Sequence, residues 1–171
     1  SPTSVGSAAP IAGSLVAVDI KGDYVFAAGA GGLQVYDIAD PANPIGVALV
    51  DSDPGGMKDV HIRGSYAYVV DGAYFQPTSL KIVDISNPTS PFLEDSKYGV
   101  ATDLNKLAIH GAYAFVTDSL GGVQMVNIDS SSADYLSTYG PFDPDETGAM
   151  SADGIAAFGG YAFAGTGDTG L

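Results

Sequence analysis

The chain has 171 residues, a formal net charge of −14 and no cysteine. So acidic a chain lacks the cationic stripe that nucleic-acid binding requires, and an anionic membrane surface would repel it. The lack of cysteine excludes disulfides, thiol catalysis and zinc–thiolate sites, and no apolar run approaches the roughly 20 residues needed for a membrane span.

A phrase built around a glycine recurs four times. Its copies are VDIKGDYVF (18–26), VHIRGSYAY (60–68), LAIHGAYAF (107–115) and IAAFGGYAF (155–163). In each copy a short, largely apolar stretch precedes the glycine, and aromatic residues follow it at the second and fourth positions. Glycine readily adopts the positive φ of a tight turn, and aromatic residues favour strands. The phrase therefore predicts an antiparallel strand pair, the inner and second strands of a repeated unit.

A second phrase follows each of the first three pairs. It reads LQVYDIADPANP at 33–44, LKIVDISNPTSP at 80–91 and VQMVNIDSSSAD at 123–134. Its first half is apolar on both faces, which indicates a third strand that is covered on both sides. Its second half is rich in turn residues, and an outer fourth strand is expected after it. The Asp or Asn that ends the third strand is expected to accept hydrogen bonds from N–H groups of the turn.

Four-stranded antiparallel units of roughly 40 to 50 residues, each sandwiched between similar neighbours, are typical of a β-propeller. We therefore predict an all-β fold with one incomplete β-propeller domain over 1–171, about three and a half blades of a larger propeller. A compact closure of four blades, completed by the N-terminal strand, is the alternative. The predicted parts are 1–14, the outer strand of a preceding blade; complete blades at 15–51, 58–98 and 104–142; and the start of a further blade at 153–171.

The stretches LKIVDISNP and GSYAYVV resemble the repeats of the LVIVD-repeat family, and the resemblance covers almost the whole chain. That family consists of β-propeller proteins found mainly on bacterial and archaeal cell surfaces or secreted. The resemblance implies a propeller fold and an extracellular or cell-surface location, but no general catalytic activity or catalytic residues. The third copy departs from the family pattern, with Asn127 for Asp and Ser130-Ser131 for Asn-Pro.

The outer-to-inner and second-to-third connections vary in length, and both emerge on the same face of a propeller. Loops on a rigid scaffold carry function more often than the scaffold does, so this face is the predicted recognition surface for a protein or glycan. Tolerated insertions without function are the alternative. The candidate residues of this face are Met57, Tyr74, Phe75, Asp143, Asp145 and Glu146.

The same loops hold two acidic clusters that suit Ca²⁺, an ion that prefers carboxylate oxygens. Asp51 and Asp53 form the first cluster, and Asp143 and Asp145 belong to the second. Turn-forming aspartates explain both clusters without a metal. We therefore expect no cofactor and keep calcium as the alternative.

Five residues on or beside the predicted inner strands are candidates to line the central channel. His61 and His110 lie on inner strands of adjacent blades, where a shared metal or proton-transfer site is one interpretation and isolated structural histidines are the other. The complete set is Lys58, His61, Arg63, Asp103 and His110.

The sequence favours a non-enzymatic, extracellular or cell-surface propeller that serves as a protein-interaction or structural module. Its expected partners are other protein chains or a surface polymer, and packing into a filament or surface layer is compatible with it. The alternative is an enzyme or a ligand- or calcium-binding propeller, whose site would lie in the central channel and be supplied partly by further blades.

Overall fold

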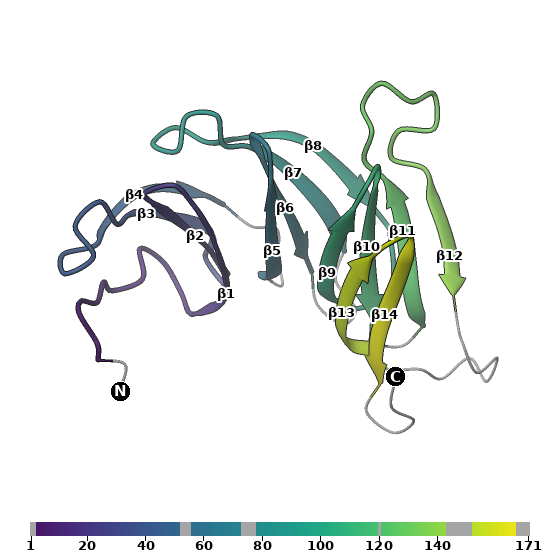
Figure 1. Ribbon diagram of the computed structural model, residues 1–171, viewed down its shortest axis with the longest axis horizontal. Helices are drawn as coiled ribbons and strands as arrows, with labels where there is room; N and C mark the ends of the chain where they lie inside the picture. Colours follow the sequence, from purple (N-terminus) through teal and green to yellow (C-terminus); the bar gives the residue numbers. More distant parts are fainter. Residues whose placement is uncertain (1–2, 52–55, 73–77, 120, 143–151, 167–171) are drawn as a thin grey trace.

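The computed structural model describes residues 3–51, 56–72, 78–119, 121–142 and 152–166 (Figure 1). Every regular element in these ranges is a β-strand, and the strands form three four-stranded sheets and one hairpin, all antiparallel. Strand order in space follows strand order in the chain within each sheet. The prediction of an all-β, propeller-type fold with four-stranded blades is confirmed.

Three blades are complete and a fourth sheet consists of the last hairpin. Blade 1 holds β1 (Leu15–Lys21), β2 (Tyr24–Gly29), β3 (Gly32–Asp37) and β4 (Ile45–Val50). Blade 2 holds β5 (Met57–Arg63), β6 (Tyr66–Asp71), β7 (Ser79–Asp84) and β8 (Phe92–Tyr98). Blade 3 holds β9 (Leu104–His110), β10 (Tyr113–Asp118), β11 (Gly122–Asn127) and β12 (Thr138–Phe142). The last hairpin holds β13 (Ala152–Phe158) and β14 (Tyr161–Thr166).

The recurring glycine makes the turn between the first two strands of every sheet. Gly22, Gly64, Gly111 and Gly159 have φ angles of 57°, 59°, 56° and 59°. A side chain disfavours this left-handed backbone, so glycine is the residue that fits the first position of such a two-residue turn. The turn predicted from the repeat is confirmed.

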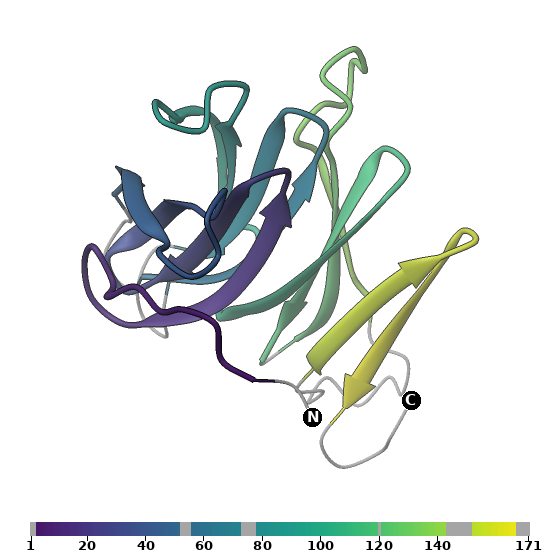
Figure 2. The ribbon, with the colours of Figure 1, turned by 60° about the vertical axis from the view of Figure 1, so that its left-hand side comes forward.

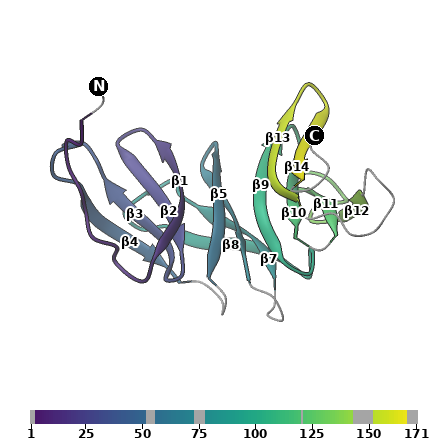
Figure 3. The same ribbon diagram turned by 90° about the horizontal axis from the view of Figure 1, so that it is seen from below.

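The sheets stand side by side in an open row. The inner strands pack in succession, β1 on β5, β5 on β9, and β9 on β13. Blade 1 and the last hairpin lie at opposite ends of this row (Figures 1 and 3), and in the turned view the yellow hairpin stands beside blade 3 (Figure 2). Each blade thus has a forward face, toward the next sheet in the chain, and a rear face, toward the previous one.

The hydrophobic core is divided between the junctions of successive blades. One cluster joins the forward face of blade 1, with Phe26 and Leu33, to the rear face of blade 2, with Val60 and Val69. A second cluster joins blades 2 and 3 in the same way. The third strands β3, β7 and β11 are buried along almost their whole length, as expected for strands covered on both faces. The core therefore holds each blade by its neighbours.

The N-terminal segment, residues 3–14, forms no strand and lies against the rear face of blade 1. The Ile11 N–H donates to Gln34 Oε1 at 2.7 Å and to the Tyr36 hydroxyl at 3.1 Å. Gln34 Nε2 donates back to the carbonyl of Ala12. Its position over β3 is where the outer part of a preceding blade would pack; that residues 1–14 are the outer strand of such a blade stays a prediction.

Within the described ranges, no helix has the length and apolar character that crossing a membrane would require.

Candidate functional site: a groove between blades 2 and 3

A polar groove opens between blades 2 and 3, on the face that carries the inner-to-second and third-to-outer turns. Its larger part has a volume of about 570 Å³, and a smaller part of about 170 Å³ adjoins it. The two parts share the walls made by Tyr66, Tyr68, Ile128 and Ser130. The remaining lining residues are Arg63, Gly64, Ser65, Ile82, Glu94, Asp95, Ala112, Asp129 and Tyr135.

The groove combines an aromatic wall with an acidic rim. The Tyr66 and Tyr68 rings meet edge to face, with centroids 6.5 Å apart, and Tyr68 is buried whereas Tyr66 is 36% exposed. Burial raises the pKa of Tyr68. The lining holds three carboxylates, Glu94, Asp95 and Asp129, and one arginine, so the net charge of the groove is negative.

Where the third strand of blade 3 ends, the groove is bordered by turns that side-chain hydrogen bonds hold in place. The Asp129 N–H donates to Asn127 Oδ1 at 2.9 Å, and Asp129 Oδ1 in turn accepts from the Ser131 N–H at 2.9 Å and from its hydroxyl at 2.6 Å. The hydrogen bonds from Ser131 lower the pKa of Asp129. In blade 2, Asp84 Oδ1 accepts from the Ser86 N–H at 2.7 Å in the same way. The expectation that the Asp or Asn ending the third strand caps the following turn is confirmed.

The Tyr135 hydroxyl should ionise late in an alkaline titration. Burial, then the charge of Asp95 and the hydrogen bond to it, raise the pKa of Tyr135 from 10.0 to about 12. A raised pKa means that this tyrosine stabilises the fold fully below pH 10 and loses that contribution as the pH rises through about 12. Tyrosinate absorbance should show a component that titrates at about pH 12 and is missing in Tyr135→Phe. Asp95→Asn should lower this pKa without restoring 10.0, since burial is the largest cause; full restoration would contradict the assignment.

The inner strands are joined by carboxylates that bridge two backbones. Asp19 accepts from its neighbour Ile20 N–H at 2.7 Å and, across the junction, from the Ile62 N–H at 2.7 Å. Asp59 likewise accepts a hydrogen bond from the Leu107 N–H of the next blade, at 3.1 Å. Inner strands have one edge without a pairing strand, so these carboxylates satisfy N–H groups that the sheets leave open. Asp19 was not identified from the sequence, because its partner lies 43 residues away on another blade.

A basic side chain also donates a hydrogen bond across each of the first two junctions between blades. Lys21 Nζ donates to the Gly64 carbonyl at 2.7 Å, and Arg63, at the equivalent position of blade 2, donates from Nη1 to the Gly111 carbonyl. Arg63 was predicted as a channel residue, and the structure shows it bound to the neighbouring turn. Lys58 is half-buried on β5, and Asp103 lies just before β9, where its N–H donates to Asp118 Oδ1 at 3.1 Å.

The two histidines are not brought together. On β5, Val60 packs toward blade 1, so alternation turns His61 toward blade 3. On β9, Leu107 packs toward blade 2, so His110 faces the last hairpin. The two histidines thus face different junctions, with blade 3 between them, which favours isolated histidines. In the part of the chain that the structure describes, no three His, Asp or Glu side chains gather to hold a metal ion.

The prediction that Met57 belongs to a loop of the recognition surface is wrong. The residue is 1% exposed and belongs to the core between blades 1 and 2, because β5 already begins at Met57. It is therefore not part of a recognition surface. Asp51 is exposed at the end of blade 1. The other predicted loop and calcium residues lie outside the described residues: Asp53, Tyr74, Phe75, Asp143, Asp145 and Glu146.

The fold defines the chain as a β-propeller module, and comparisons with solved structures agree. It is similar to the computationally designed Ika4 protein, with a TM-score of 0.67 and 10% identity over 100% of this chain and 96% of that one. It is also similar to the computationally designed Ika8 protein, with a TM-score of 0.63 and 11% identity over 92% of this chain and 44% of that one. At such identities the likeness concerns the fold alone. No curated protein matches the sequence.

The repeats identify the family. The LVIVD repeat matches residues 12–52 and 54–97, which correspond to blades 1 and 2. The chain is an LVIVD-repeat protein over these two blades, and the resemblance noted in the sequence is confirmed.

Proposed function

We propose that this propeller is a non-enzymatic interaction module that acts outside the cell or on its surface, and that its groove between blades 2 and 3 binds a basic segment of a partner protein. The observation that carries the proposal is the groove itself, which places Glu94, Asp95 and Asp129 around an aromatic wall. Carboxylates on a rim attract lysine and arginine side chains, and tyrosine faces bind their alkyl chains and cationic heads.

The charge of the whole chain supports a basic partner. A net charge of −14 produces a negative field that attracts cations and speeds their encounter with the groove. The acidic composition and the family resemblance together support an extracellular or surface location. A non-enzymatic role is supported by Arg63, a predicted channel residue whose guanidinium is engaged in holding two blades together.

A lysine tetrapeptide is a suitable probe, with a glutamate tetrapeptide as its control. Backbone amide shifts are expected to change at Tyr66, Ser130 and Tyr135 on addition of the lysine peptide, and the binding should weaken as salt rises. Asp95→Asn should weaken binding several-fold, whereas Asp51→Asn, which removes an exposed carboxylate outside the groove, should leave it nearly unchanged.

Two results would contradict the proposal. Shifts spread over the whole acidic surface and insensitive to Asp95→Asn would mean that the peptide binds by net charge alone. A maltooligosaccharide that shifts the groove amides while the lysine peptide does not would assign the groove to a glycan instead.

A further inference from the structure

The two ends of the row of blades carry the two halves of one junction. Inside the chain, each junction joins the forward face of one sheet to the rear face of the next, with β1 on β5, β5 on β9 and β9 on β13. Among the described residues, nothing covers β1 on its rear side or the last hairpin on its forward side. The apolar side chains left exposed there are those that the inner junctions bury.

The rear side of β1 shows this residue by residue. Val18 and Ile20 occupy the repeat positions of Val60 and Ile62. Val60 is 6% exposed, because it packs against the forward face of blade 1. Val18 and Ile20, by contrast, are 62% and 59% exposed, and Val16 beside them is 59% exposed. The strand β1 therefore presents an inter-blade surface without its partner.

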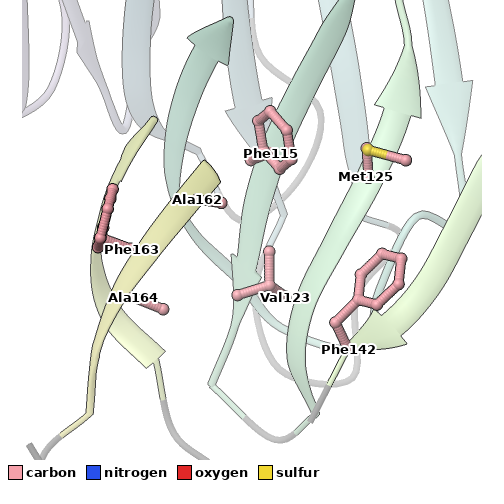
Figure 4. Close-up of a pocket in the computed structure, with 7 residues that line it drawn as sticks. All are labelled: Phe115, Val123, Met125, Phe142, Ala162, Phe163 and Ala164. Atoms are coloured by element: carbon pink, nitrogen blue, oxygen red, sulfur yellow. The ribbon is translucent and has the colours of Figure 1, made fainter. Parts of the chain in front are cut away.

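The last hairpin presents the complementary half. Phe163 occupies the repeat position of Phe26, which is fully buried, but Phe163 is 51% exposed. Figure 4 shows Ala162 and Ala164 directed toward blade 3, where they border an apolar cavity of about 460 Å³ that Phe163 also lines, and the Phe163 ring directed away from blade 3. The forward face of the hairpin is thus an aromatic surface of the kind that receives an inner strand.

The N-terminal segment limits the open surface on blade 1 to the inner strand. It covers the rear face at Gln34 and Tyr36 on β3, and Ile11 also lies beside Gly46 on β4. It leaves β1 uncovered. The remaining strip is where the inner hairpin of a preceding blade would pack.

From these two matching halves we infer that the chain binds a second copy of itself head to tail, with β1 of one copy seated on the last hairpin of the other. Val18 and Ile20 then pack on Phe163 as Val60 and Ile62 pack on blade 1. The halves complement each other and not themselves, so the interface is heterologous and generates a closed ring or an open filament. Blade 1 and the last hairpin, which carry the two halves, lie at opposite ends of the row (Figures 1 and 3).

The similarity to the Ika8 fold and the net charge of the chain both bear on how two copies would associate. The chain aligns with less than half of the Ika8 chain, so a fold of this type has room for a second row of comparable length. Two copies that each carry −14 repel one another, and salt screens this repulsion. The dimerisation is therefore expected to strengthen as ionic strength rises, in contrast to the binding of a basic peptide in the groove.

A complementation experiment tests the inference. By sedimentation at high salt, the wild-type chain should reach at least twice its mass of 17.3 kDa as its concentration increases. Val18→Asp alone and Phe163→Asp alone should each weaken self-association about tenfold or more, because a charge would be buried in an apolar junction. Mixed together, the two variants should form a one-to-one pair, since each contributes the half that the other lacks.

Phe92→Asp is the control, because Phe92 is also 53% exposed but lies on the outer strand of blade 2, away from both ends. It should associate as the wild type does, and far-UV circular dichroism should show all variants folded. A wild-type chain that stays monomeric at every soluble concentration overturns the inference, as does a mixture that fails to pair. A monomer that Val18→Asp strongly destabilises also overturns it, because the two ends would then close within one chain.

Discussion

Phe26→Ala is expected to lower the free energy of unfolding by about 3–5 kcal/mol, among the largest effects of any single substitution in this chain. The Phe26 ring is fully buried at the centre of the junction between blades 1 and 2, where it meets Val60 and Val69. Truncation removes its contacts and leaves a cavity that two rigid sheets cannot close. Urea unfolding followed by far-UV circular dichroism measures the loss, since the chain has no tryptophan.

The matched control is Phe92→Ala, because Phe92 is 53% exposed on β8. Its effect should stay within about 0.5 kcal/mol. Equal losses for the two substitutions would show that stability does not reside in the contacts between blades.

Lys81→Met is expected to destabilise the chain by about 3–5 kcal/mol, because it leaves a buried carboxylate without its cation. Lys81 Nζ lies 3.2 Å from Asp71 Oδ2 inside blade 2, and both side chains are almost completely buried. Asp71 Oδ1 accepts from the Ser79 hydroxyl, but Oδ2 accepts no well-aligned hydrogen bond, so the ion pair is its compensation. The measurement is again urea unfolding.

The double variant Asp71→Val/Lys81→Met should recover part of the lost stability, since apolar side chains can replace a buried ion pair at little cost while the buried Ser79 hydroxyl loses its acceptor. Lys106→Met is the control for the lysine substitution. Lys106 is 37% exposed and 3.9 Å from Asp59, so its loss should change stability by no more than about 1 kcal/mol. A double variant as unstable as Lys81→Met alone would contradict a pair whose role is mutual neutralisation.

The repeat determined how much of this fold could be predicted. The glycine turns and the strands around them follow from local chemistry: Gly64 with Tyr66 predicts a turn and a strand wherever the phrase occurs. Both faces of β7 are apolar, which predicted that neighbours cover them. Such features depend on residues close together in the chain, and they were predicted correctly.

The candidate site depends on contacts that no local pattern contains. The groove arises where Tyr66 of blade 2 meets Ser130, from the turn in which the third repeat departs from the others. The bridge from Asp59 to Leu107 spans 48 residues and needs the relative position of two blades. Met57 was assigned to a loop because the predicted blade began one residue later, and that single residue separates an exposed position from the core.

The hydrogen bond from a basic side chain to the next blade has a consequence for the evolution of repeat proteins of this kind. Lys21 and Arg63 both bind the main-chain carbonyl of the recurring turn glycine, Gly64 and Gly111, so the hydrogen bond uses no side chain of the acceptor blade. The donor blade therefore makes no demand on the side chains of its neighbour at this contact. A blade can be duplicated, lost or exchanged for a diverged one while the hydrogen bond persists, which makes this contact suited to a gene that grows by copying its own repeats.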